Sequence, residues 1–187
     1  MKALILHGTA SDHMGNWFPW LKTELEKLGL EEVWVPDLPG SEKPNVERYT
    51  KFLLSKNWDF DNTLIIGHSS GAVEVLDLLE NLPEGQKANT AIMVAVFKGG
   101  LGWESLKDLE TVKFDYDKIK SKAKKLIVVH SDDDPHCPID GAREIAANLS
   151  AQMQEFHGMK HFSISTDSRF TKFPELLEII KRQVINT

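Results

Sequence analysis

Short, mostly apolar runs alternate with amphipathic segments along this 187-residue chain. The runs predict strands at residues 3–6, 32–35, 63–66, 90–97, 125–129 and about 152–156. Between most of them, apolar residues recur at helical spacing, at residues 17–28, 73–79, 145–149 and 176–184. Helices that alternate with strands cover both faces of a parallel sheet. We therefore expect one α/β domain over residues 1–187, a three-layer α/β/α sandwich with a mostly parallel sheet of about six strands.

Composition argues against several classes of protein. The net charge of −6 disfavours binding to nucleic acid or to an anionic membrane, because both reward a basic surface. Cys137 is the only cysteine, so the chain holds no internal disulfide. The first apolar run ends at His7-Gly8, too early for a signal peptide, and no run approaches the roughly 20 apolar residues of a membrane span. We expect a cytoplasmic monomer or small homo-oligomer.

The segment Leu64–Val73, LIIGHSSGAV, leads from a predicted strand into a predicted helix through a cramped turn. Gly67 and Gly71 lie two residues before and after Ser69, where a turn that exposes a serine oxygen requires small residues. The N–H of Ser70 would lie at the helix start, facing developing negative charge. The alternative is an ordinary connection in which small residues gather. The strand–turn–helix context favours a nucleophile elbow with Ser69 as nucleophile.

A serine nucleophile needs a base, and the base needs an orienting carboxylate. Ligands of a parallel α/β sheet bind beyond the carboxyl ends of its strands. Residues 132–134, all aspartates, follow one predicted strand, and His161 comes after the last. The chain order serine, acid, histidine is the one that a nucleophile elbow of this kind requires. The sequence therefore predicts a catalytic triad at the sheet edge.

Several motifs together resemble the α/β-hydrolase superfamily: His7-Gly8, a first helix with tryptophans, Gly67-His68-Ser69-Ser70-Gly71, Asp134-Pro135 and Gly158…His161-Phe162. The small size and the segment at residues 114–120 are similar to the compact retinoblastoma-binding-protein and YdeN-like serine hydrolases. The resemblance covers nearly the whole chain. It implies a single-domain parallel sheet, a Ser-Asp-His triad and no cofactor.

The acid and the base of the triad are each chosen among rivals. Asp134 is favoured because an acid followed by Pro135 resembles the acid loop of the family, whereas Asp132 and Asp133 are typical of solvated loop carboxylates. The family's usual Gly-His-Phe is lengthened by two residues at 158–162, which leaves His157 as a rival to His161.

Further residues are expected around this triad. Ser70 and Thr9 are expected to supply the backbone donors of the oxyanion hole, with Ala10 as the alternative to Thr9. Trp103, which follows a glycine-rich stretch at 99–102, is expected to wall the acyl pocket, or else to be packed helix surface. Histidines and aspartates crowd residues 130–136, but a metal would compete for the carboxylate that the base needs. We expect no metal.

These roles predict a carboxylesterase-like serine hydrolase (EC 3.1.1) that cleaves a small ester, thioester or amide through an acyl-enzyme. The interval at residues 97–124 is too short for a large cap domain, so the site should be shallow or partly open and accept small acyl substrates. The second hypothesis is a protein-binding module on a hydrolase fold, with incidental catalysis, because the family name records a binding role and a fold does not fix function. A protein partner therefore stays open.

Overall fold

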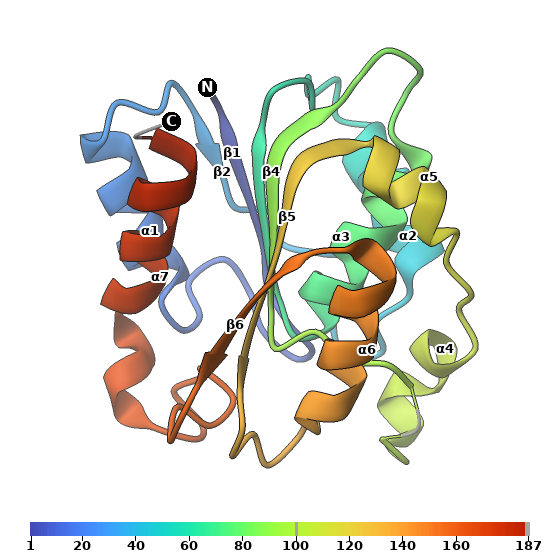
Figure 1. Ribbon diagram of the computed structural model, residues 1–187, viewed down its shortest axis with the longest axis vertical. Coiled ribbons are helices and arrows are strands. Elements are labelled where there is room, and N and C mark those ends of the chain that lie inside the picture. The colour runs from blue at the N-terminus through green and yellow to red at the C-terminus, as the bar shows by residue number, and fades with distance from the viewer. Residues whose placement is uncertain (100, 186–187) are drawn as a thin grey trace.

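Six parallel strands form one sheet between two layers of helices in the computed structural model, which describes residues 1–99 and 101–185 (Figure 1). The strands are β1 (Ala3–Leu6), β2 (Val33–Trp34), β3 (Leu64–His68), β4 (Ala88–Val94), β5 (Ala123–Ser131) and β6 (Gln152–Phe156). Their order across the sheet is β2-β1-β3-β4-β5-β6. All neighbouring pairs run parallel, which confirms the predicted α/β sandwich. Gly100, in the glycine-rich stretch before Trp103, lies outside the described residues.

Helices cover both faces of the sheet. On one face lie α1 (Phe18–Lys27) and α7 (Pro174–Ile180), and on the other α2 (Val46–Leu54), α3 (Ser70–Asn81), α5 (Tyr116–Ser121) and α6 (Ile139–Leu149) (Figure 1). The short helix α4 (Lys107–Glu110) follows β4, after a 3₁₀ turn at Glu104–Leu106. A second 3₁₀ turn spans Ser168–Thr171, and a π-helical turn spans Lys181–Ile185.

Alternate residues of the central strands enter two separate hydrophobic cores. Leu4 and Leu6 of β1 pack with α2 and α3, whereas Ala3 and Ile5 pack with α1 and α7. The same alternation continues through β3, β4 and β5. Strands that are buried on both faces need apolar residues at successive positions. This double burial explains the continuous apolar runs from which the sheet was predicted.

Helix α2 was not predicted, although its start carries a local signal. The side chain of Asn45 accepts a hydrogen bond from the backbone N–H of Arg48 at 2.9 Å, which caps the first turn. Tyr49 and Leu53 lie on the face of this helix that is buried in the core. Within the described residues, no helix is both long and apolar enough to cross a bilayer.

The carboxyl ends of the strands lie along one edge of the sheet, because β1, β3, β4, β5 and β6 run in the same direction. The loops that leave this edge carry every residue singled out for chemistry. The segment after β4 forms only short helical elements, at Glu104–Leu106, α4 and α5, in its described part. Loops and short helical elements therefore border this edge.

Candidate active site

Ser69 occupies a strained turn between β3 and α3. Its φ of 56° and ψ of −122° are a conformation that non-glycine residues rarely adopt. The flanking glycines are required by close approach of the backbone: a Cβ on Gly67 would lie 2.2 Å from the carbonyl oxygen of Gly71, and one on Gly71 would lie 2.4 Å from that of His7. The small residues thus let β1, β3 and α3 meet around a serine at the tip of the turn.

The structure brings Ser69, His161 and Asp134 together. The Nε2 of His161 lies 3.1 Å from Ser69 Oγ, and its Nδ1 lies 2.7 Å from Asp134 Oδ2. An ionised carboxylate only accepts hydrogen bonds, so the hydrogen bond network assigns the proton to Nδ1 and leaves Nε2 to accept the Ser69 hydroxyl. The side chains of His161 and Asp134 are 8% and 0% exposed, so water competes little for this pair.

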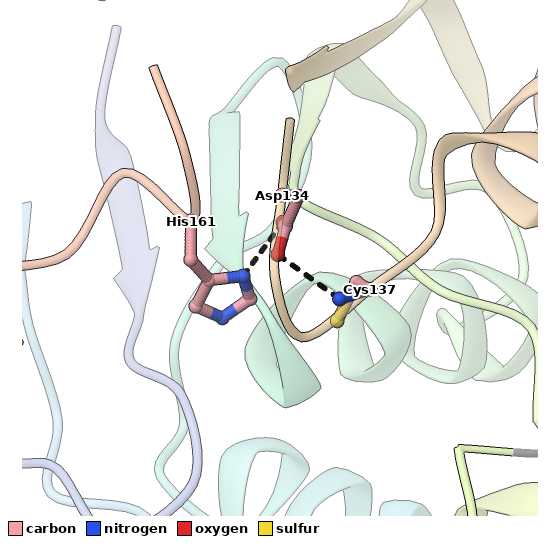
Figure 2. Close-up of side chains that lie close together, drawn as sticks. All are labelled: Asp134, Cys137 and His161. Atoms are coloured by element: carbon pink, nitrogen blue, oxygen red, sulfur yellow. Dashed lines mark hydrogen bonds and ion pairs between the residues drawn. The ribbon is translucent and has the colours of Figure 1, made fainter. Parts of the chain in front are cut away.

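Backbone amides fix the carboxylate of Asp134. Its Oδ1 accepts hydrogen bonds from the N–H groups of His136 at 2.8 Å and Cys137 at 3.0 Å. Figure 2 shows the carboxylate bonded both to the His161 ring and to the Cys137 nitrogen. Burial by itself raises the pKa of Asp134, but the hydrogen bonds from His161 and from the two amides outweigh it and lower the pKa below its ordinary value. The carboxylate is therefore ionised at neutral pH.

The rival acids and the rival base are occupied elsewhere. His157 Nδ1 lies 2.6 Å from Asp132 Oδ2 on the surface, and its side chain is 84% exposed. Asp133 Oδ1 accepts hydrogen bonds from the Ser131 hydroxyl at 2.6 Å and from the Lys160 N–H at 2.8 Å. The three consecutive aspartates thus each have a different partner, and only Asp134 faces the histidine beside Ser69.

The extra two residues of the 158–162 segment are accommodated by unusual backbone conformations on both sides of His161. Lys160 and Phe162 have φ values of 50° and 52°, in the left-handed region. The carbonyl oxygen of Phe162 accepts a hydrogen bond from Trp17 Nε1 at 3.0 Å, which ties the segment to the turn before α1. This conformation directs His161, rather than His157, at the elbow.

The two backbone donors proposed for the oxyanion hole lie on loops that touch. Ser70 is the first residue of α3, where an N–H has no acceptor within the helix. The Thr9 hydroxyl donates to Ser70 Oγ at 3.0 Å. The N–H of Ala10 is committed to the carbonyl oxygen of Ser41 at 3.0 Å. Of the two alternatives, only the Ala10 N–H has a backbone acceptor among the described residues, which favours Thr9 as the second donor.

A cavity of about 530 Å³ opens over Ser69 and His161. Trp103 lines it and is 47% exposed. The Trp103 ring lies 5.3 Å from the ring of His136, which in turn packs edge-on against the ring of His161 at 5.0 Å. The sequence does not single out His136, which is one of several histidines and aspartates at residues 130–136. Its position two residues after Asp134 is the signal that could have identified it as a site residue.

Asp134, Cys137 and His161 place a carboxylate oxygen, a thiol and a ring nitrogen within 4.8 Å of one another. This donor set does not suit a metal ion. Burial raises the pKa of the Cys137 thiol, which keeps it protonated, and thiols bind metals as thiolates. Both oxygens of Asp134 already accept hydrogen bonds, and His161 Nδ1 donates one. Metal binding would dismantle the arrangement around Ser69.

His7 has a structural place beside the site. Its Nδ1 lies 2.9 Å from the carbonyl oxygen of Gly8, and its Nε2 accepts a hydrogen bond from the Leu38 N–H at 2.8 Å. Burial lowers the pKa of His7, so the neutral ring donates with one nitrogen and accepts with the other. The ring thereby joins the end of β1 to the loop after β2.

Sequence comparison places the chain in a known family. The sequence profile of the serine hydrolase family matches residues 3–182. YdeN of Bacillus subtilis (strain 168) is 28% identical over 178 residues, covering 94% of this chain and 92% of YdeN. Serine hydrolase RBBP9 of Rattus norvegicus is 25% identical over 184 residues, covering 96% and 94%.

Solved structures share the fold. The crystal structure of the ydeN gene product from B. subtilis has a TM-score of 0.88 at 26% identity and covers 97% of both chains. A monoacylglycerol lipase from Paleococcus ferrophilus has a TM-score of 0.73 at 15% identity, and the match covers 100% of this chain and 95% of the lipase. At this identity the match shows the α/β-hydrolase fold alone. By its sequence and its fold, the chain belongs to the serine hydrolase family.

Proposed function

We propose that this protein hydrolyses small carboxylic esters through an acyl-enzyme formed on Ser69. The observation that carries the proposal is the chain of two contacts from Ser69 Oγ to His161 Nε2, at 3.1 Å, and from His161 Nδ1 to Asp134 Oδ2, at 2.7 Å. Membership of the serine hydrolase family supports it. Thioesters and amides present the same carbonyl group and are the related substrates that this arrangement would accept.

In the acylation step, Ser69 Oγ attacks the carbonyl carbon while His161 Nε2 takes the hydroxyl proton. The carbonyl oxygen becomes an oxyanion, which the N–H groups of Ser70 and Thr9 are proposed to bind. Collapse of the tetrahedral species breaks the bond to the leaving oxygen, and His161 returns the proton to that oxygen. Asp134 stays ionised throughout and stabilises the charged imidazole, consistent with its lowered pKa.

Deacylation repeats the sequence with water. His161 Nε2 removes a proton from a water molecule as its oxygen attacks the acyl carbon, and the proton is then delivered to Ser69 Oγ as the acyl bond breaks. The products are a carboxylic acid and free enzyme. The chain's own residues supply every proton transfer, so the proposal includes no cofactor and no metal.

The dimensions of the site favour small substrates. A cavity of about 530 Å³ is at the lower part of the range for small-molecule sites. Trp103 is half exposed at its wall. We propose that Trp103 contacts the acyl group.

Pre-steady-state kinetics with p-nitrophenyl acetate test this function. An acyl-enzyme mechanism predicts a burst of p-nitrophenol equal in amount to the enzyme, followed by slower turnover. Ser69→Ala should show neither phase above the uncatalysed rate. Steady turnover in folded Ser69→Ala would contradict the proposal. Absence of both phases in the wild-type protein would favour the binding-module hypothesis.

A further inference from the structure

The cavity over Ser69 has two chemically different sides. Ser69 follows β3, and β3 lies between β1 and β4 in the sheet. Polar residues from the loop after β1 and from residues 163–166 line one side: Ser11, Asn16, Ser165 and Thr166. Apolar residues from the segment after β4, Leu101, Trp103 and Leu106, line the other, together with His136, whose ring lies 5.3 Å from that of Trp103. A substrate attached to Ser69 therefore meets both surfaces at once.

The polar side is a connected group of hydroxyls and one amide. Ser163 Oγ lies 2.9 Å from Ser165 Oγ and 3.1 Å from Thr166 Oγ1. Asn16 Oδ1 accepts the N–H of Ile164 at 2.9 Å, which places residues 163–166 on the β1 side of the cavity. The Asn16 amide nitrogen has no acceptor among the described residues, so its two hydrogens are available to a ligand.

The lining of the cavity selects for an uncharged ligand. None of the described residues that line it is Asp, Glu, Lys or Arg. A carboxylate or phosphate would therefore find no cation in the wall, and an ammonium group would find no carboxylate. Hydroxyl groups suit the polar side, because hydroxyl and amide groups can both donate to them and accept from them.

The apolar side is incompletely covered. Trp103 is 47% exposed beside Leu101 and the buried Leu106. Burying apolar surface of this kind stabilises a complex in proportion to the area removed from water. An aliphatic or aromatic arm of the substrate would cover the exposed ring.

The oxyanion hole fixes which arm lies on which side. Thr9, one of its two proposed donors, follows β1, so we expect the carbonyl oxygen of the bound ester to point toward the β1 side. The substituents of a carbonyl carbon point away from one another, which directs the acyl chain toward the loop after β4. The leaving oxygen must reach His161 Nε2, and residues 163–166 directly follow His161 in the chain.

We infer that the substrate is an uncharged monoester with a short apolar acyl group and a hydroxylated alcohol, such as a monoester of a polyol. The acyl group packs on Trp103 and Leu106, and the alcohol binds Asn16 and Ser165. The inference rests on the proposed ester hydrolysis, and it adds the chemical class of each half of the substrate.

Three uncharged esters of matched size test the inference on the wild-type protein. Glyceryl butyrate carries the predicted arrangement, 2-methylbutyl butyrate replaces both hydroxyls by methyl groups, and butyl 2,3-dihydroxypropanoate reverses the two arms. We expect kcat/KM for glyceryl butyrate to exceed that of each of the others about tenfold, the effect of one or two neutral hydrogen bonds. Equal values, or a preference for the reversed ester, would overturn the inference.

Variants of each side add an internal check, read as ratios of kcat/KM between two substrates. Asn16→Asp keeps the acceptor for Ile164 and tolerates the left-handed φ of 47°, but loses the amide hydrogens. It should lower the preference for glyceryl butyrate over 2-methylbutyl butyrate several-fold, whereas the exposed Ser168→Ala should leave this ratio unchanged.

Trp103→Ala should lower the preference for glyceryl butyrate over glyceryl acetate several-fold. Met14→Ala, a change at an exposed apolar residue outside the cavity lining, is its control. Unchanged ratios in Asn16→Asp and Trp103→Ala would overturn the assignment of the two sides. Fluorophosphonate labelling of Ser69 distinguishes failure of this inference from failure of the proposed function. If Ser69 is labelled but these substrate preferences are absent, the inference alone is overturned. If Ser69 is not labelled and no ester is hydrolysed, the proposed function is overturned and this inference with it.

Discussion

The Nε2 of His68 donates a hydrogen bond to the carbonyl oxygen of His161 at 2.8 Å and so joins the residue before the proposed nucleophile to the proposed base. Burial, with the nearby His161, lowers the pKa of His68 to about 3, so the ring is neutral. A carbonyl oxygen only accepts, and the single ring hydrogen therefore lies on Nε2. His68 holds the elbow and the base loop at a fixed separation.

Replacing His68 should lower kcat with little change in KM. Displacement of a catalytic group by about 1 Å costs on the order of 100-fold in rate, so we expect His68→Leu to lose about that much kcat. His68→Gln has an amide that can donate to the same carbonyl oxygen and should recover part of the loss. The measurement is kcat and KM on p-nitrophenyl acetate, with the melting temperature as a check of folding. Equal loss in both variants would argue against positioning through this hydrogen bond.

Two histidine–aspartate pairs of similar geometry provide a matched test of the base. His161 contacts Asp134 at 2.7 Å beside Ser69, and His157 contacts Asp132 at 2.6 Å on the surface. We expect His161→Ala and Asp134→Asn each to lower kcat by about 10³- to 10⁴-fold, the effect of losing a base or its orienting carboxylate. His157→Ala and Asp132→Asn should cost about tenfold or less, because they act only through long-range charge. An inactive His157→Ala beside an active His161→Ala would reverse the assignment.

Removal of metal ions should leave ester hydrolysis unchanged. The donor atoms of Asp134, Cys137 and His161 are engaged in the hydrogen bonds of the site or protonated. Prolonged dialysis against a chelator, followed by the p-nitrophenyl acetate assay, is the measurement. Activity that disappears on chelation and returns with a divalent ion would show that a metal takes part.

A buried carboxyl group on α3 makes stability depend on pH. Thr50 has one hydroxyl hydrogen, yet its Oγ1 lies 2.8 Å from Glu74 Oε1 and 2.6 Å from Asp77 Oδ2. A proton on the Glu74 carboxyl group supplies the second of these two hydrogen bonds, with Glu74 Oε1 as donor and Thr50 Oγ1 as acceptor. Burial raises the pKa of Glu74 well above its ordinary value, although the contact with Thr50 opposes the shift, and Asp77 raises it further. Glu74 is therefore neutral in the folded protein.

Glu74→Gln should remove this dependence. In the unfolded chain Glu74 ionises above about pH 4.3, whereas in the folded protein it keeps its proton. The contribution of Glu74 to the free energy of unfolding is therefore complete below that pH and declines as the pH rises toward the pKa of the folded state. The glutamine variant should therefore be more stable than the wild type at pH 7 and should lose this advantage near pH 4. Urea unfolding from pH 4 to 8 measures it, with the exposed Glu84→Gln as control. Identical pH profiles for the wild type and Glu74→Gln would contradict a neutral Glu74.

The sheet and the elbow were predictable because local sequence determines them. Doubly buried strands need apolar runs, and the turn at Ser69 needs Gly67 and Gly71 where the backbones meet. Helix α2 was missed although Asn45 caps it, because its apolar pattern is short.

Details of the site depend on contacts between residues far apart in the chain. The commitment of the Ala10 N–H to Ser41 cannot be read from either segment alone. His161 was predicted from the sequence with His157 as its rival. The conformations that direct His161 at the elbow were not, because Lys160 and Phe162 adopt left-handed φ values that non-glycine residues rarely adopt.

Mapping the covalent adduct of a fluorophosphonate on the native protein tests the central claim most directly. The strained elbow and the contact with His161 single out Ser69 as the reactive serine. Mass spectrometry of the digested adduct should place the modification on Ser69 alone, and folded Ser69→Ala should remain unmodified. An adduct on Ser70 or another serine, or labelling that persists in Ser69→Ala, would contradict Ser69 as the nucleophile.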